Sequence, residues 1–288
     1  RGTGVRGLIN IQFAYVSENL YVIEANPRAS RTVPFVSKAT GVQMAKAAVL
    51  IGLGKTIAEL KAEGYLPSKM DGASLPQETA IAVKAAVLPF ARFRTPEGVV
   101  VDSLLSPEMR STGEVMGLDK HYDTAFAKAQ AGAGSPLPTS GKVFISVANH
   151  DKRNVIIYAK MLESLGFEIV STGGTAEILR RNGLNSVIVA SKFAEANGDH
   201  SIVDMVRNGD IDLILNTPAG GAARSDGYEI RAAAVSVGCP VMTTISEFAA
   251  AVQAINALRE HSWDIMSLQE HGVQLAAAVD ARSEGGEA

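Results

Sequence analysis

The stretch KVFISVANHDKRNVIIYAKMLESLGFEIVSTGGTAEIL, Lys142 to Leu179, alternates two kinds of segment. Residues 142–148 and 167–172 are short and apolar, as strands are, whereas the segment between them has apolar residues at helical spacing and ends at Gly166. Another helix is expected from Thr175 onward. Short strands that alternate with helices of about ten residues predict crossover connections and a parallel sheet.

The same alternation continues beyond this stretch. Further strands are expected at 186–191, 212–218 and 240–244, and further helices at 201–209, 227–238 and 247–260. The sequence therefore predicts a three-layer α/β unit at 142–275, followed by a polar tail at 276–288 that is expected to fray.

A Gly- and Pro-rich segment marks the expected start of this unit. GAGSPLPTSG at 132–141 contains three glycines, two prolines and three hydroxyl residues, a composition typical of a linker. Residues 1–131 are then a first unit, in which we expect helices at 42–52, 56–64 and 119–131 and a strand at 84–93. A chain of 288 residues is long enough for two cores.

Composition excludes several classes of protein. The net charge is −3 and no basic run stands out, which argues against nucleic-acid binding. Cys239 is the single cysteine and cannot form an internal disulfide, and the apolar stretches are too short or too interrupted for a membrane span. We therefore expect a cytoplasmic protein. The chain begins without Met and reaches a strand-like run at once, which indicates a piece of a longer protein.

Three loops at the carboxyl ends of the expected strands carry polar groups, and ligands of parallel sheets bind at that edge. The first loop contains Lys152, the second is STGGTA at 171–176, and the third is the Gly-rich stretch 216–226. Lys192 follows another strand. Free N–H groups at a helix start, together with the lysines, favour a phosphate or carboxylate site. The alternative is that Thr175 only caps its helix and that the glycines only turn the chain.

Two resemblances cover nearly the whole chain. KVFISVANHDK, GFEIVSTGGTAEIL and DLILNTP resemble the methylglyoxal synthase-like domain, over about Gly141–Leu258. That domain occurs in methylglyoxal synthase, in a bifunctional purine enzyme and in carbamoyl phosphate synthetase. EANPRASRTVPFVSKATG, Glu24–Gly41, and PEMRSTGEVMG, Pro107–Gly117, resemble signatures of the carbamoyl phosphate synthetase large subunit family. The resemblance implies the end of its second ATP-grasp module, an α+β fold, followed by the allosteric domain.

The resemblance also implies a reaction. In that family the second module uses ATP to phosphorylate carbamate, which gives carbamoyl phosphate for pyrimidine and arginine biosynthesis. Bicarbonate activation occurs in another module, and a separate glutaminase small subunit releases ammonia. Potassium is a further candidate ion, and family members commonly self-associate. The nucleotide-binding half of the module would precede Arg1, so this fragment alone is expected to be inactive.

A metal site is expected near the N-terminus. A hairpin turn at Ser17–Asn19 would place Gln12 opposite Glu24, and Asn26 would lie on the same face. One carboxylate and two amides suit Mg²⁺ or Mn²⁺ held against nucleotide phosphates. In the family, the residues that match these three hold the metal.

Two arginines follow the metal residues in the sequence. The family residue that matches Arg28 contacts the phosphate that is transferred. Arg31 has two open interpretations, a role in the site or a bridge between neighbouring carboxylates.

The allosteric domain is expected to bind a nucleoside monophosphate, with UMP as inhibitor first and IMP second. The residues that match the family's effector site are Ser146, Lys152, Thr172, Thr175, Lys192, Asn216 and Thr217. Pro218 departs from the family version, which has a hydroxyl residue there. Asp226 and Arg231 are expected to cap a helix or to couple the domain to the ATP-grasp part.

A second departure concerns the activator ornithine. The family has an acidic residue where this chain has Ala85, after Lys84. Thr243 matches another residue of that site and does not restore the lost charge. An ornithine response is therefore doubtful from the sequence.

Two other enzymes of the same domain class are alternatives. A methylglyoxal synthase needs a carboxylate base and a histidine, for which Asp199 and His200 are candidates. However, the loop after the fourth strand contains no histidine, and Asp199 is also suited to cap the helix at 201–209. The purine cyclohydrolase would continue into a long transformylase domain.

Overall fold

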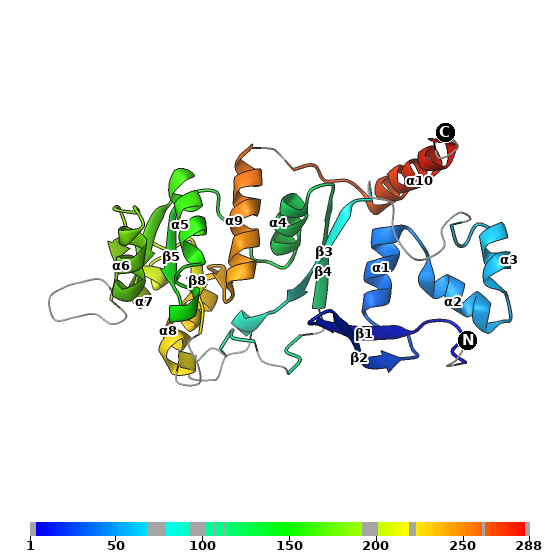
Figure 1. Cartoon of the computed structure of the whole chain (residues 1–288), viewed down its shortest axis with the longest axis horizontal. Coiled ribbons are helices and arrows are strands. Elements are labelled where there is room, and N and C mark those ends of the chain that lie inside the picture. The colour runs from blue at the N-terminus through cyan, green and yellow to red at the C-terminus, as the bar shows by residue number, and fades with distance from the viewer. Residues whose placement is uncertain are drawn as a thin grey trace. The chain divides into compact units, whose positions relative to one another are not determined.

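The computed structural model describes residues 4–67, 79–92, 102–105, 108–111, 113–191, 201–218, 223–260 and 263–285. The chain divides into two compact units, one of residues 1–81 with 264–288 and the other of residues 82–263. Figure 1 labels most elements of both. The division differs from the predicted one, because residues 82–131 belong to the same unit as the parallel sheet and the Gly- and Pro-rich segment 132–141 lies inside that unit.

The second unit contains the predicted parallel sheet. Its strands are β5 (Lys142–Ser146), β6 (Glu168–Ser171), β7 (Ile188–Val189), β8 (Leu213–Asn216) and β9 (Val241–Met242). They pair in the order β7-β6-β5-β8-β9, and every pairing is parallel. The strand order reverses between β5 and β8. At such a switch point two loops leave in opposite directions and open a crevice for ligands.

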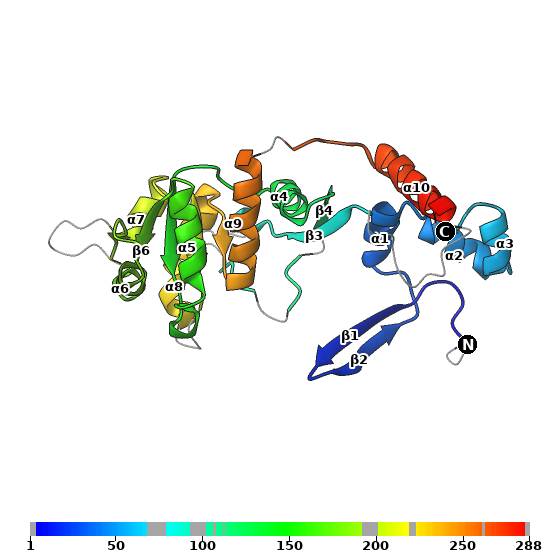
Figure 2. The same ribbon diagram turned by 45° about the horizontal axis from the view of Figure 1, so that its top comes forward.

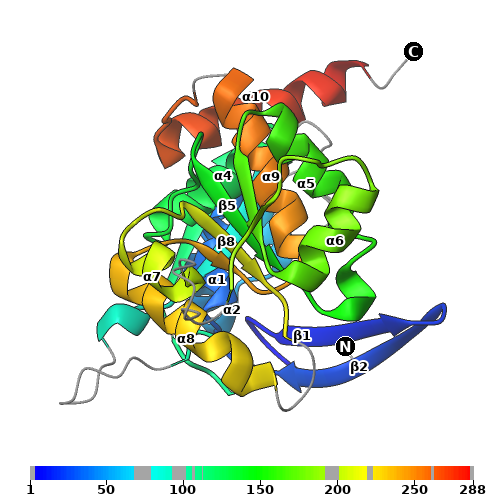
Figure 3. The same ribbon diagram turned by 90° about the vertical axis from the view of Figure 1, so that its left-hand side faces the viewer.

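Helices cover both faces of this sheet, as the three-layer prediction requires (Figure 3). They are α5 (Val155–Ser164), α6 (Gly173–Arg181), α7 (Ile202–Arg207), α8 (Ala223–Val237) and α9 (Ile245–Glu260), with a short 3-10 turn, η2, at Asn149–Asp151. Alternate strand residues separate the two cores: Val143 and Ile145 pack with α5, α6 and α9, whereas Phe144 packs with α7 and α8.

A small strand pair and a helix complete the second unit. β3 (Ile81–Val87) pairs with β4 (Gly113–Asp119), a 3-10 turn, η1, spans Phe90–Arg92, and α4 is Tyr122–Gly132. A Cβ on Gly117 would lie 1.9 Å from the carbonyl oxygen of Ala125. The backbones of β4 and α4 therefore touch at Gly117, and only glycine fits there.

In the first unit, β1 (Asn10–Val16) and β2 (Asn19–Asn26) form an antiparallel ribbon, as predicted (Figure 2). The turn residues Ser17 and Glu18 have φ values of 48° and 65°, the left-handed geometry that a two-residue hairpin loop requires. Several large apolar side chains of the ribbon are exposed, such as Tyr15 at 72% and Leu20 at 64%.

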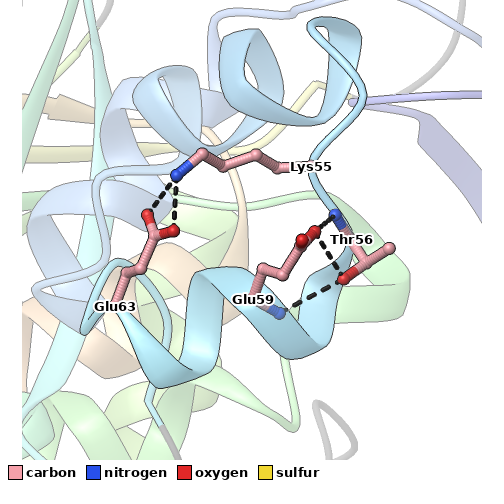
Figure 4. Close-up of polar contacts among 4 residues, drawn as sticks. All are labelled: Lys55, Thr56, Glu59 and Glu63. Atoms are coloured by element: carbon pink, nitrogen blue, oxygen red, sulfur yellow. Dashed lines mark hydrogen bonds and ion pairs between the residues drawn. The ribbon is translucent and has the colours of Figure 1, made fainter.

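The first unit also has four helices in its described residues. They are α1 (Thr32–Thr40), α2 (Met44–Gly52), α3 (Ile57–Ala62) and α10 (Leu268–Gly285). Figure 4 shows the capping box that starts α3: Thr56 Oγ1 accepts from Glu59 N at 3.2 Å and Glu59 Oε2 accepts from Thr56 N at 2.7 Å, while Lys55 pairs with Glu63.

The predicted polar tail is wrong for residues 276–285, because α10 runs to Gly285 and contacts α1. The run of helix-forming residues QLAAAVDAR outweighs its polar character. Within the described ranges, no helix combines the length and the hydrophobicity that a bilayer span needs.

Candidate functional site

Polar residues of the ribbon meet on one face. The register pairs Gln12 with Glu24 and Asn10 with Asn26, so these four side chains project from the same side. Asn26 Nδ2 donates to Glu24 Oε1 at 2.9 Å. The register shifts just after Gln12, where β2 carries an extra residue, and such a bulge changes the direction in which neighbouring side chains point.

This arrangement fits a hard cation. Because Asn26 donates through Nδ2, its Oδ1 stays an acceptor, and Glu24 Oε2 and the amide oxygens of Gln12 and Asn10 are further oxygens on this face. Mg²⁺ is typically held by one or two carboxylates together with substrate phosphates. Among the described residues, no three His, Cys, Asp or Glu side chains gather into a metal cluster, so amide ligands would have to contribute here. The sequence did not single out Asn10, although its pairing with Asn26 follows from the hairpin register.

The two arginines lie between this ribbon and α1. Arg28 N donates to Asn26 O at 2.9 Å, which forms a tight turn, and Arg28 Nη1 donates to Ala29 O at 3.1 Å. The side chain of Arg28 is exposed, so its other guanidinium donors are open to solvent and could bind an anion. Arg31 occupies the position before the first residue of α1. Both interpretations of Arg31 stay open.

The second candidate site lies at the switch point of the parallel sheet. Ser146 ends β5 and Thr172 follows β6, and their hydroxyl oxygens are 3.3 Å apart. Thr217, after β8, accepts a hydrogen bond from Ala148 N at 2.8 Å through Oγ1. Asn216 is the last residue of β8. Four of the predicted effector residues therefore lie at the carboxyl edge of three adjacent strands: Ser146, Thr172, Asn216 and Thr217.

The start of α6 presents free backbone donors at the same edge. Thr172 is the residue before α6, and its hydroxyl makes no capping bond within the described chain. Gly173 and Gly174 donate no hydrogen bond to any described residue. Lys152 Nζ lies 3.3 Å from the position that a Cβ on Gly174 would take. A helix start with free N–H groups and a lysine beside it is suited to an anion.

Thr175 does not cap α6, so the alternative that Thr175 serves only as a helix cap is not supported. It is the third residue of the helix, 2% exposed, and its Oγ1 lies 3.5 Å from Val147 N. The helix also starts two residues before the predicted position.

Some predicted residues lie outside the described ranges. These are Lys192, Asp199 and His200. The residue that caps α7 is Ser201, whose Oγ accepts from Asp204 N at 3.1 Å, and not Asp199 as the alternative held. Asp226 lies within α8 and not before its first residue.

Arg231 pairs with Asp102, a residue that the sequence reasoning missed. The guanidinium is fully buried, and its Nη2 lies 2.7 Å from the carboxylate. The only sequence feature that could have indicated Asp102 is its place as the single acid in the mostly apolar run VVVDSLL, which precedes the stretch PEMRSTGEVMG. The sequence predicted that Arg231 caps a helix or couples the domain to the ATP-grasp part. Asp102 and Arg231 both lie in the second unit, so this contact does not test the coupling, which stays a prediction.

The residues matched to an ornithine site have other partners. Lys84 on β3 pairs with Glu114 on β4 at 3.5 Å. Thr243 N donates to Glu247 Oε2 at 3.3 Å, and Glu247 N donates to Thr244 Oγ1 at 3.2 Å, which together cap α9. Ala85 supplies no charge.

Burial raises the pKa of the Glu247 carboxyl above its ordinary value of 4.5, and the hydrogen bond from Thr243 N opposes part of the effect. A carboxyl whose pKa is raised in the folded protein destabilises it above that pKa, and the cost vanishes as the pH falls below the ordinary value. We expect Glu247→Gln to raise the midpoint of thermal unfolding at about pH 7.5, where the carboxyl of the wild type is ionised. This gain should shrink as the pH falls toward about 4.

Thermal unfolding followed by circular dichroism across that pH range measures this difference. Glu260→Gln, at the exposed end of the same helix, is the matched control and should show little effect at any pH. A gain for Glu247→Gln that grows as the pH falls would contradict the burial argument.

Comparison with protein families divides the chain in the same order. Residues 1–60 match the model of the carbamoyl-phosphate synthase L chain, ATP binding domain. Residues 154–243 match the model of the MGS-like domain. The polar face of the ribbon lies within the first match, and the start of α6 and the end of β8 lie within the second.

Curated relatives cover nearly the whole chain. A carbamoyl phosphate synthase large chain from Kocuria rhizophila is 70% identical over 273 residues, which is 94% of this chain and 25% of the relative. Those from Paenarthrobacter aurescens and Streptomyces coelicolor are 65% and 56% identical, over 97% of this chain and 26% of theirs. The chain thus spans about a quarter of the length of the relatives that it matches. The resemblance in the sequence is confirmed: the chain is similar to the C-terminal region of these large chains.

Proposed function

Since the chain corresponds in sequence to the C-terminal region of carbamoyl phosphate synthase large chains, with an MGS-like domain, we propose that it contributes to the phosphorylation of carbamate by ATP. The observation that carries this part is the pairing of Gln12 with Glu24 beside Asn26. In this proposal the chain supplies metal- and phosphate-binding residues, and the remainder of the large subunit supplies the nucleotide pocket.

The residues on the ribbon have distinct tasks in this proposal. Glu24, Gln12 and Asn26 hold Mg²⁺ or Mn²⁺ through oxygen atoms, and the bound ion neutralises charge on the phosphates of ATP. Arg28 orients the transferred phosphate. Its guanidinium is exposed and the residue lies just after the end of β2, next in sequence to the residues of the polar face. The hydrogen bond from Asn26 to Glu24 holds the carboxylate in one orientation.

The MGS-like domain is the regulatory part in this proposal, and UMP is its first candidate ligand, with IMP second. The free N–H groups of Gly173 and Gly174 and the ammonium of Lys152 would bind the phosphate. Ser146, Thr172 and the residues at the end of β8 would contact the remaining oxygens of the nucleotide. Lys192 belongs to the same proposal on its sequence position alone.

The wider context follows from the proposed activity. The large subunit would work with a glutaminase small subunit that supplies ammonia, in the cytoplasm, and would self-associate. Its product would serve pyrimidine and arginine biosynthesis. Potassium is a further candidate ion, and the separate chain is expected to form no carbamoyl phosphate.

Binding of UMP to this chain tests the regulatory part. Isothermal titration calorimetry should detect UMP binding, and Lys152→Ala should weaken it about tenfold or more, because hydrogen bonds to charged groups contribute about 1.5–3 kcal/mol each. The matched control is Lys160→Ala, an exposed lysine of α5 that should leave the affinity unchanged.

Two outcomes would contradict the proposal. One is a folded wild-type chain that binds neither UMP nor IMP at millimolar concentration. The other is the formation of methylglyoxal from dihydroxyacetone phosphate, which would favour the lyase alternative.

A further inference from the structure

Arg231, on α8, is buried between a carboxylate and an amide. Its exposed fraction is 0%, and Nε and Nη2 donate to Oδ1 and Oδ2 of Asp102 at 2.7 Å each. Nη1 donates to Oδ1 of Asn216 at 2.9 Å. A planar guanidinium bound to both oxygens of a carboxylate has little freedom to rotate, so the position of Nη1 is fixed as well.

The contact with Arg231 determines the orientation of the Asn216 amide. A guanidinium has donors and no acceptor, so the amide oxygen must be the atom that faces it. The NH₂ group of Asn216 therefore points away from Arg231, and it donates to no described residue. Asn216 ends β8 at the switch point, next to Thr217.

Gly227, one turn before Arg231 on α8, leaves room for this arrangement. A Cβ at this position would lie 2.2 Å from Arg231 Nη1 and 2.4 Å from Asn216 Oδ1. Such distances are far shorter than van der Waals contact, so any larger residue would displace the guanidinium or the amide. Glycine at position 227 therefore leaves the space that the hydrogen bond between Arg231 and Asn216 occupies.

We propose that Asp102 and Arg231 are positioning residues that hold Asn216 with its NH₂ group presented to the ligand of the switch point. The ligand group that meets Asn216 is then a hydrogen-bond acceptor, either a phosphate oxygen or a sugar hydroxyl oxygen. The class of ligand rests on the function proposed above. The orientation of the amide rests only on the hydrogen bond from Arg231, whose guanidinium the ion pair with Asp102 holds in place.

Asn216→Asp tests the direction of the hydrogen bond. A carboxylate has nearly the same shape and still accepts from Arg231, so the fold should persist, but it replaces the donor with an anionic acceptor. We expect UMP affinity to fall about tenfold or more. Calorimetry with UMP, uridine and inorganic phosphate shows which ligand group meets Asn216. If the variant also binds uridine more weakly, that group is a sugar hydroxyl. If it also binds inorganic phosphate more weakly, that group is a phosphate oxygen. Unchanged affinity for all three would overturn the proposal.

Asp102→Asn tests the positioning role through a double-mutant cycle. This variant should weaken UMP binding about threefold or more, since Arg231 loses its ion pair with Asp102 and Asn216 loses its fixed orientation. If Asp102 acts through Asn216, the same substitution should change affinity little in an Asn216→Ala background. A purely structural role predicts the same loss in both backgrounds, and that result would overturn the proposal.

The side-chain amide signals of Asn216 give a readout that needs no ligand. In ¹⁵N-labelled protein, Asp102→Asn should shift these signals, whereas those of Asn182, which donates to Ile178 O, should not move. If wild-type protein binds no probe, the proposed ligand class fails and this shift still decides the positioning role. Signals of Asn216 that do not change would refute it.

Discussion

Replacing Glu24 with alanine in the full-length large chain is expected to abolish the phosphorylation of carbamate while glutamine hydrolysis continues. Glu24 is the single carboxylate on the polar face of the ribbon, opposite Gln12 and bonded to Asn26. Its removal leaves only neutral amide oxygens for the cation, and loss of one electrostatic contact in an active site typically lowers kcat by about 10²- to 10³-fold. The measurement is carbamoyl phosphate formation, with glutaminase activity and bicarbonate-dependent ATP hydrolysis followed in parallel.

Glu63→Ala is the matched control for this experiment. Glu63 is another exposed carboxylate of the first unit, and its partner is Lys55 and not the ribbon. Its replacement should leave all three activities near the wild-type rate. Synthesis at the wild-type rate by the Glu24 variant would show that the ribbon does not hold the essential cation.

Replacing Gly117 with alanine is expected to destabilise the second unit by about 3 kcal/mol or more. The new Cβ would lie 1.9 Å from Ala125 O and 2.6 Å from Ala129 N, and both are backbone atoms that cannot rotate away. β4 and α4 would have to separate, and α4 contributes Phe126 and Ala127 to the core on one face of the parallel sheet. Urea unfolding followed by circular dichroism measures the loss.

Gly132→Ala provides a control on the same helix. Gly132 is the last residue of α4, and its Cβ would lie 3.5 Å from the nearest atom of Val115, an ordinary contact. Because alanine favours helix more than glycine, this variant should be neutral or gain up to about 1 kcal/mol. Equal unfolding midpoints for the two variants would disprove a tight backbone contact at Gly117.

The sequence predicted the parallel sheet well because each of its strands is a short apolar run between helices. Phe144 lies between Val143 and Ile145, and this continuous run is typical of a strand buried on both faces. The pairing of Gln12 with Glu24 was predictable because a two-residue turn fixes the register of a hairpin.

Other features depend on contacts that local patterns do not contain. The helix α1 was not predicted: its sequence TVPFVSKAT contains two β-branched valines and a proline, and the left-handed Gly41 ends it. The pairing of Asp102 with Arg231 joins residues far apart in the chain, so no spacing rule could find it. The division into units was also missed, because α10 returns to the unit that the first residues begin.

That return has a consequence for synthesis on the ribosome. The second unit is continuous in the chain, so it can fold as soon as it leaves the exit tunnel. The residues that begin the first unit emerge earlier, yet α1 lacks its contact with α10 until residues 268–285 have been made. We expect the order of folding to run against the order of translation, with the earlier-made residues settling last and depending most on chaperones.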